Sequence, residues 1–169
     1  VLAKTESQSV WEQEVRDDSP RLWYRLGEQS GTVVADSSSY GNHLAYVGGA
    51  TFNKRDGLIA GDEDGAIAFD GAASGQYAQG DLPTVSLGSH VWEFAVDGSG
   101  ATIGTAVYAE GSSTAASLTI SVNFNSGNVT VDWTDDAGNF DSSNTIGSGV
   151  DVGDDNPHVI AFKYDSAVG

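Results

Sequence analysis

The sequence predicts an all-β protein, built as a two-sheet antiparallel sandwich or jelly roll. Three observations lead to this prediction. Short runs of alternating apolar and polar residues recur along the chain, turn-forming Gly, Asp, Asn and Ser separate them, and no segment beyond Asp18 shows a helical period. A period of two with one apolar face is typical of strands half buried in an antiparallel sheet, and many short strands with frequent turns favour two stacked sheets.

Runs of this kind predict strands at residues 22–26, 43–47, 66–70, 91–96, 101–110, 117–124, 128–134 and 158–165. In the run that contains VWEFAV, Trp92, Phe94 and Val96 share one face of the strand, while Glu93 and Ala95 share the other. The loop NFNSGNV contains a Ser-Gly pair and separates two alternating runs, so it predicts a hairpin.

The composition favours an acidic, folded domain. Hydrophobic residues make up 39% of the 169 residues and include four Trp, six Tyr and six Phe, which is enough for one domain with a core. Seven basic and 24 acidic residues give a net charge of −17, which repels nucleic acids and anionic membranes. The excess acid serves solubility in the simplest interpretation, and divalent-cation binding or life in salty water in sharper ones.

Several classes of site and segment are excluded by what the sequence lacks. It contains no Cys, which excludes disulfides, thiolate metal sites and cysteine nucleophiles. No apolar run approaches the roughly 18 residues of a membrane span, and no signal peptide is visible. Because methionine is absent even at position 1, we expect a processed chain or a piece of a longer polypeptide.

The first 18 residues differ from those that follow. Residues 1–18 are polar and have no convincing apolar face, so they predict a helix-like lead-in or linker, followed by one domain over residues 19–169. The stretch DSSSYGN at the start of that domain predicts a tight turn. Asp36 can accept backbone N–H bonds within the turn, Gly41 can adopt a positive φ, and Asn42 tolerates strained geometry.

This turn and its neighbours resemble the opening half of a LamG-like domain, a family of concanavalin A-like jelly rolls found in secreted bacterial proteins and tailed-phage virion proteins. The resemblance covers about residues 19–165 in order and is specific in its first half. It rests on the strand Tyr24–Glu28, the pair Gly31-Thr32, the turn Asp36–Asn42, the triplet Phe69-Asp70-Gly71 and a later strand that ends in Tyr164-Asp165.

Two departures from the family pattern bear on the fold. Pro157 stands where the family has a Trp, and the chain ends at Gly169, where the family continues with a hairpin and an acidic closing strand. A sheet without its last strands would expose open edges, so we expect a jelly roll that lacks those strands here and continues in a longer polypeptide.

The resemblance also implies a Ca²⁺ site, in which Asp36 and Asn42 share the ion with acids of the closing strand. Calcium prefers carboxylate and carbonyl oxygens. The alternative, which we favour from the residues themselves, is that Asp36 and Asn42 hold the turn together and bind no ion.

No residue is predicted to be catalytic. A glycosidase needs two carboxylates about 5 to 10 Å apart, which alternate residues of one strand could supply, but no E-x-D-x-E run exists. The three histidines show no metal-pair spacing, and there is no G-x-S-x-G elbow or phosphate loop. The remaining acidic groups fit surface positions or turns: Glu93, Asp97, Asp132, Asp135, Asp136 and the stretch 61–65, the last with weak cation binding as the alternative.

Four side chains are the candidates for binding a ligand. Alternation along the run 22–26 places Trp23 and Arg25 on the face away from the core. That face is either a stacking platform for a sugar, or a surface covered by the amino-terminal segment or by a neighbouring subunit. Tyr40 and Tyr46 flank the predicted turn and are the next candidates.

We therefore expect a non-catalytic binding or structural module of a tailed-phage virion protein, such as a minor tail or fibre component, that contacts host-surface glycan or neighbouring virion proteins. The phage assignment and the location in a virion rest on the resemblance alone. The alternative is a carbohydrate-binding module of a secreted bacterial enzyme, and a weaker third reading is a glycosidase with unrecognised catalytic acids.

Overall fold

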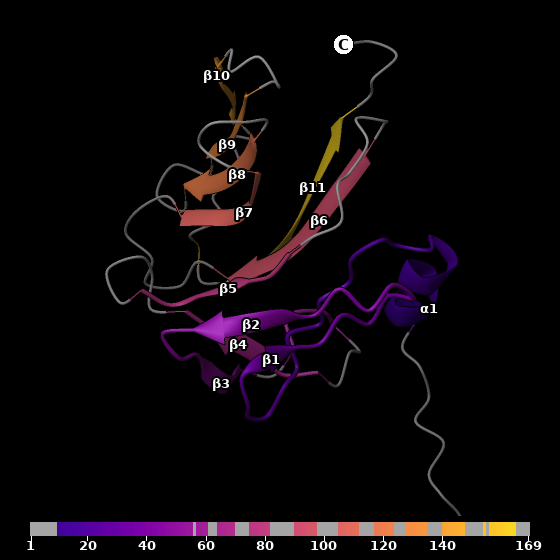
Figure 1. The fold of residues 1–169 in the computed structure, drawn as a ribbon. Coiled ribbons are helices and arrows are strands. Elements are labelled where there is room, and N and C mark those ends of the chain that lie inside the picture. The colour runs from indigo at the N-terminus through magenta and orange to yellow at the C-terminus, as the bar shows by residue number, and fades with distance from the viewer. Residues whose placement is uncertain are drawn as a thin grey trace, which may run out of the picture. The chain divides into compact units, whose positions relative to one another are not determined.

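The computed structural model describes residues 10–55, 57–60, 64–69, 75–81, 90–97, 105–111, 117–123, 128–134, 140–147, 154 and 156–164 (Figure 1). Within these ranges the chain forms one helix, α1 (Val10–Asp17), and the following strands. They are β1 (Val33–Val34), β2 (Leu44–Val47), β3 (Thr51–Arg55), β4 (Ala66–Ala68), β5 (Tyr77–Gln79), β6 (His90–Asp97), β7 (Thr105–Gly111), β8 (Ser117–Asn123), β9 (Asn128–Thr134), β10 (Phe140–Gly147) and β11 (Pro157–Tyr164).

Every strand pairing in the described ranges is antiparallel. The prediction of an all-β, antiparallel chain with little helix is therefore confirmed. The contacts along the backbone divide the chain into two compact units, Val1–Thr84 and Val85–Gly169. The first unit contains α1 and β1 to β5, and the second contains β6 to β11.

The lead-in contains the short helix α1. Arg16, in its last turn, contacts Glu12 one turn earlier, an i,i+4 pair that supports a helix. The helix ends at Asp17, and two residues later Ser19 adopts a positive φ of 52° and donates its N–H to the carbonyl of Arg16 at 3.0 Å. Pro20 follows and cannot continue the helix. No helix in the described ranges has the length and hydrophobicity needed to cross a membrane.

The first unit holds a three-stranded sheet in the order β1-β2-β5. Val34 pairs with Leu44, so their side chains point to the same face of the sheet, and Val34 is fully buried. On the opposite face, Val33 pairs with Ala45 and is 53% exposed. The sheet therefore packs one face into the core of the unit and presents the other outward, as expected for a small antiparallel sheet.

Tyr46 joins this sheet to the β3–β4 hairpin. Its ring meets the ring of Phe52 edge-on at 5.4 Å between centroids and lies 6.1 Å from the ring of Phe69. Phe52 belongs to β3, and Phe69 directly follows β4. Aromatic pairs of this geometry stabilise a core beyond the area that they bury, so Tyr46 has a packing role.

The second unit holds a four-stranded sheet in the order β10-β9-β8-β7 and the pair β11-β6. Asn123 of β8 pairs with Asn128 of β9, which confirms the predicted hairpin, although its loop lies outside the described residues. In β6, Trp92, Phe94 and Val96 are half-buried while their neighbours Val91, Glu93 and Ala95 are exposed, as the alternation predicts. Trp92 packs on Phe162 of β11 with ring centroids 5.5 Å apart.

The predicted strand at residues 22–26 is wrong. The segment contributes one isolated bridge, between Tyr24 and Asp36, and Leu26 has a positive φ of 55°. The reason is that the N–H of Trp23 bonds to the Asp36 side chain and not to a neighbouring strand. The sequence analysis also missed β1, β3, β5 and β10, in which apolar and polar residues do not alternate over a long run.

Candidate functional site

One carboxylate holds the Asp36 turn, residues 36–42. Asp36 Oδ1 accepts hydrogen bonds from the backbone N–H groups of Trp23 and Ser38, each at 2.9 Å. Its Oδ2 accepts one from the N–H of Asn42 at 2.8 Å and one from the hydroxyl of Ser38 at 2.7 Å. The side chain is buried. These four donors match the acceptor positions of an ionised carboxylate, and the prediction that Asp36 accepts N–H bonds within its own turn is confirmed.

Backbone geometry and two further hydrogen bonds fix the turn. Gly41 has a φ of +69°, as predicted, whereas Asn42 does not adopt a positive φ and so carries no such strain. The carbonyl of Asn42 accepts a hydrogen bond from the Tyr24 hydroxyl at 2.6 Å. The N–H of Asp36 donates to His43 Nδ1 at 3.0 Å. Hydrogen bonds therefore link the turn to Tyr24 in the segment before it and to His43, which directly precedes β2.

The hydrogen bonds set the electrostatics of the turn. Burial alone would raise the pKa of Asp36, but the bonds from Ser38, Trp23 and Asn42 outweigh it and lower that pKa below its ordinary value. A Ca²⁺ ion on Asp36 would have to replace some of these donors. The Asn42 side chain, for its part, donates through Nδ2 to the carbonyl of Arg21 at 3.4 Å. The geometry favours the structural interpretation of Asp36 and Asn42, and calcium stays a prediction.

The protein should lose stability at high pH as the Tyr24 hydroxyl ionises. Burial, and then the negative charge of Asp36, raise the pKa of Tyr24 to about 12. Because the folded protein holds this proton more tightly than the unfolded chain, its contribution to stability is complete below about pH 10 and is lost as the pH rises through about 12. The ionised oxygen could no longer donate to Asn42.

We expect the melting temperature of Tyr24→Phe to decline less steeply between about pH 10 and 12 than that of the parent protein, because the variant has no hydroxyl proton to lose there. Thermal melts across that range, followed by circular dichroism, measure the decline. Tyr40→Phe, at an exposed ring, is the control and should keep the parent slope. Equal slopes for Tyr24→Phe and the parent would contradict the expectation.

Glu28 makes a second internal link. Its Oε1 accepts the backbone N–H of Ala35 at 2.8 Å, and its Oε2 accepts the hydroxyl of Tyr46 at 2.8 Å. Burial, followed by this bond and the charge of Glu28, raises the pKa of Tyr46 well above its ordinary range. Glu28 thus connects the segment before β1 with Ala35, directly after β1, and with Tyr46 of β2.

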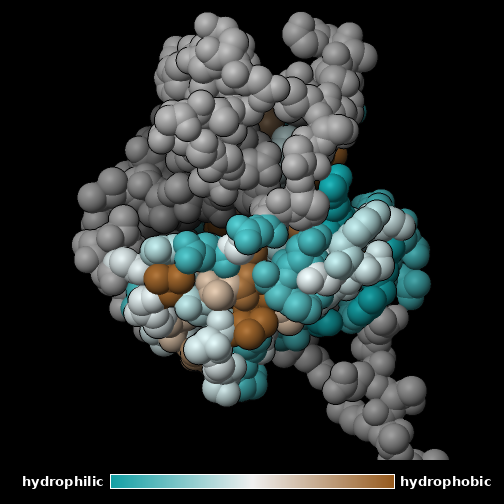
Figure 2. Space-filling view, in the orientation of Figure 1, coloured by the Kyte–Doolittle hydropathy of each residue, from teal (hydrophilic) through white to brown (hydrophobic). Residues whose placement is uncertain are grey.

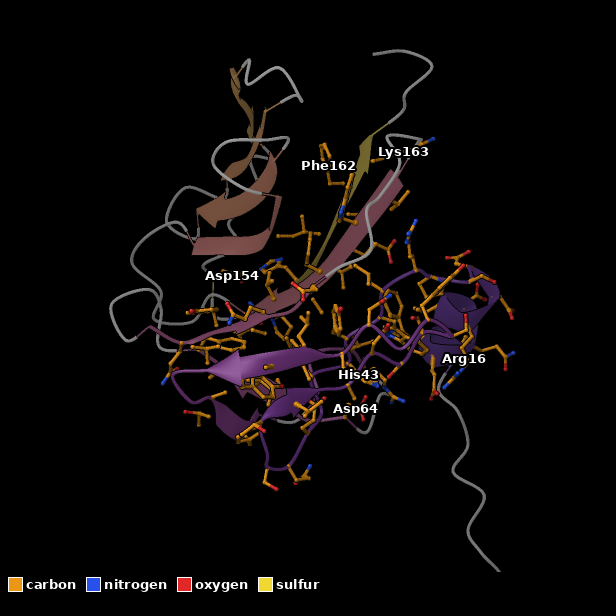
Figure 3. All side chains as sticks on the ribbon, viewed as in Figure 1. Arg16, His43, Asp64, Asp154, Phe162 and Lys163 are labelled. Atoms are coloured by element: carbon orange, nitrogen blue, oxygen red, sulfur yellow. The ribbon has the colours of Figure 1, made fainter. Side chains whose placement is uncertain are left out.

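The Trp23 cluster comprises Glu12, Arg16, Trp23, Arg25 and Asp64. The guanidinium carbons of Arg16 and Arg25 lie 5.0 Å and 5.7 Å from the ring centroid of Trp23, within the range of cation–π contacts. Glu12 Oε1 lies 2.8 Å from Arg16 Nη2 and 3.3 Å from Arg25 Nη1. Asp64 Oδ2 makes an ion pair with Arg25 Nε. Arg16 on α1 and Asp64 are both labelled in Figure 3.

An open pocket of about 210 Å³ lies beside this cluster. Gly27 lets Asp64 lie close to the backbone at the pocket wall, because a Cβ at position 27 would lie 3.0 Å from the carboxyl carbon of Asp64. The charged side chains in its walls already have bonds: Arg25 with Asp64, and Glu28 with Ala35 and Tyr46. The pocket is lined by Arg25, Gly27, Glu28, Ala35, Ser37 and Asp64.

The structure separates the four predicted ligand-binding side chains. Trp23 and Arg25 lie together and are half-buried, and Arg16 of α1 lies over the Trp23 ring. This arrangement matches the alternative in which the amino-terminal segment covers that face. Tyr46 is half-buried, packs against Phe52 and Phe69 and bonds to Glu28. Tyr40 is 63% exposed at the tip of the Asp36 turn. Of the four, Tyr40 is the ring that is most open to a ligand.

Glu12 and Asp64 are cluster members that the sequence analysis did not single out. The i,i+4 spacing of Glu12 and Arg16 was a usable signal for their pairing. No signal in the sequence connects Asp64 with Arg25, because 39 positions separate them and only the fold brings them together. The sequence predicts that Asp64 belongs to an acidic turn at residues 61–65, and residues 61–63 of that turn lie outside the described residues.

The remaining acidic and histidine predictions are tested only in part. Asp70, Asp135 and Asp136 lie outside the described residues, and so does the side chain of Asp132. His158 Nε2 lies 2.8 Å from Asp154 Oδ1. Searched over the described residues alone, no three His, Asp or Glu side chains form a group that could hold a metal ion.

Comparison with protein-family models, with curated proteins and with solved structures found no match.

Proposed function

We propose that this chain is a non-catalytic binding module, of LamG-like jelly-roll type, within a tailed-phage virion protein such as a minor tail or fibre component. It contacts host-surface glycan, or neighbouring virion proteins, through the first unit. The antiparallel strands of both units and the Asp36 turn support the proposal, because they are the features that the family resemblance led us to expect.

The observation that carries the proposal is the exposed ring of Tyr40 on a turn held by hydrogen bonds. The ring is 63% exposed. The turn beneath it is fixed by the four hydrogen bonds of Asp36, and the backbone N–H of Tyr40 itself donates to the Ser38 hydroxyl at 3.2 Å. Because these bonds order the backbone that carries the ring before any ligand arrives, less conformational entropy is lost when a ligand stacks on it.

The chemistry of the ligand follows from the ring and from the charge of the chain. The apolar face of a sugar stacks on an aromatic ring, and the Tyr hydroxyl can bond to a sugar hydroxyl. A net charge of −17 repels anionic ligands. The proposal is therefore for a neutral glycan.

A glycan array probed with the parent protein and with Tyr40→Ala tests the proposal. Because an aromatic contact contributes about 0.5–1.5 kcal/mol, we expect Tyr40→Ala to weaken binding about 2- to 12-fold. Tyr77→Ala, which removes a ring that is 47% exposed on β5, is the matched control and should bind like the parent. Equal binding by Tyr40→Ala and the parent would remove Tyr40 from the site. Hydrolysis of any arrayed polysaccharide would overturn the non-catalytic assignment.

A further inference from the structure

The buried side of α1 has a charge at its centre. Glu12 is 8% exposed, with the half-buried Trp11 and Val15 beside it, while Glu14 on the same helix is exposed. Figure 2 shows a mostly hydrophilic surface where α1 lies. An amphipathic helix ordinarily docks by an apolar stripe. Here a carboxylate occupies the middle of the docking side, so ion pairs contribute to the attachment.

Glu12 brings two arginines to one indole. Its Oε1 contacts Arg16 within α1 at 2.8 Å and Arg25 beyond the helix at 3.3 Å. Both guanidinium groups also lie against Trp23. Without the negative charge of Glu12, Arg16 and Arg25 lose the acid that they share, and Arg25 keeps its ion pair with Asp64. The repulsion between the two cations then favours their separation. We therefore expect the docking of α1 to depend on the charge of Glu12.

The helix should exist only when docked. With eight residues, α1 is shorter than the roughly 12–15 residues that an isolated helix needs to be stable in water. Release from the body of the unit is thus expected to unfold it. This gives two distinct states, one docked and helical and one released and disordered, as a switch requires.

We propose that α1 is an ion-held latch over Trp23 and Arg25, and that its release uncovers these two side chains as a second surface for the ligand of the module. The ligand part of this inference rests on the proposed function. In the docked state Arg16 occupies the space over the Trp23 ring that a sugar would take. Binding of glycan at Trp23 and docking of α1 are then mutually exclusive, and each opposes the other.

High salt is expected to release α1 from Trp23 and Arg25. The side chains of Arg16 and Arg25 are 44% and 27% exposed and that of Glu12 is 10% exposed, so water and ions reach each pair from the side of the arginine. Ion pairs between partly exposed groups weaken as the ionic strength rises, because the Debye length falls from about 10 Å at 0.1 M to about 3 Å at 1 M. We therefore expect the released state to gain population at high salt.

Hydrogen exchange of the α1 amides tests the latch without any ligand. Glu12→Gln keeps the shape of the side chain and removes its charge, and we expect it to speed exchange in α1 about tenfold or more, as 1 M salt should in the parent protein. Glu14→Gln removes an exposed charge from the same helix and is the matched control, expected to exchange like the parent. If Glu12→Gln and 1 M salt both leave the exchange of α1 unchanged, the latch is excluded.

The glycan array then tests what the latch covers. We expect Glu12→Gln to bind the glycan several-fold more tightly than the parent, and the double variant Glu12→Gln with Trp23→Ala to lose that gain. If α1 is released and the binding of glycan does not become tighter, the proposal that α1 covers a ligand surface at Trp23 is wrong. Absence of binding by every variant would overturn the proposed function and leave the exchange result intact, so the two failures can be told apart.

Discussion

Asp36→Ala is expected to destabilise the first unit by about 2–4 kcal/mol. The change removes the acceptor of three backbone N–H groups and one hydroxyl, and a buried donor left without an acceptor costs about 1–3 kcal/mol. The total stays below the sum because water can reach the half-buried donors. Urea unfolding followed by Tyr and Trp fluorescence measures the loss, provided the slope of the transition does not change.

The matched comparison is Asp36→Asn. This side chain keeps one oxygen for Trp23 and Ser38 but presents an amide to the N–H of Asn42, so its loss should be intermediate. Asp81→Ala removes an exposed carboxylate and should stay within about 0.5 kcal/mol of the parent. The order parent, Asp36→Asn, Asp36→Ala is the prediction, and a stability of Asp36→Ala equal to that of the parent would show that the turn does not depend on this carboxylate.

Acid should remove the same contribution. The pKa of Asp36 is lowered in the folded protein, so the stability that it provides is complete above about pH 4 and is lost as the pH falls through its folded-state value. The difference between the parent and Asp36→Ala should therefore shrink on acidification.

Gly48→Ala is the other substitution with a large expected effect, about 2–5 kcal/mol of destabilisation. A Cβ at Gly48 would lie 2.3 Å from the carbonyl oxygen of Gly75, a backbone atom that cannot turn aside. Gly48 also has a φ of +73°, which L-residues with side chains rarely adopt. Because Gly48 directly follows β2 and Gly75 lies just before β5, the clash would push these two paired strands apart.

Gly49→Ala separates the two causes. Gly49 has a similar φ of +81°, but a Cβ there would meet nothing within 4 Å. We expect it to lose about 1 kcal/mol from backbone strain alone. Thermal unfolding of the two variants side by side measures the excess of Gly48→Ala, which reports the contact with Gly75. Equal losses would mean that the close approach of the two backbones contributes nothing.

Sequence patterns predicted the long alternating strands well, and local chemistry predicted the Asp36 turn. The run VWEFAV became β6 with the expected face inward, because alternation needs no knowledge of the partner strand. The bonds from Asp36 to Ser38 and Asn42 followed from spacing within seven residues. The same Asp36 misled the prediction at residues 22–26, where it takes the N–H of Trp23 from 13 positions away.

Other features could not be predicted because they depend on long-range pairing. The strand β10, with the sequence FDSSNTIG, has no alternation of its own and extends because β9 pairs with it. The ion pair between Asp64 and Arg25 needs the fold to exist first. The place of Tyr46 beside the turn indicates a ligand contact, yet its ring packs against Phe52 and Phe69, which come from later in the chain.

The residues that hold the Asp36 turn in shape are different from those exposed at its tip. Asp36, Ser38, Gly41 and Asn42 fix the loop through their own bonds and backbone geometry. Ser39 and the ring of Tyr40 are exposed at its outer end. Substitutions at these two positions therefore leave the hydrogen bonds that hold the loop in place, so the outer end of the turn can vary while its base stays the same.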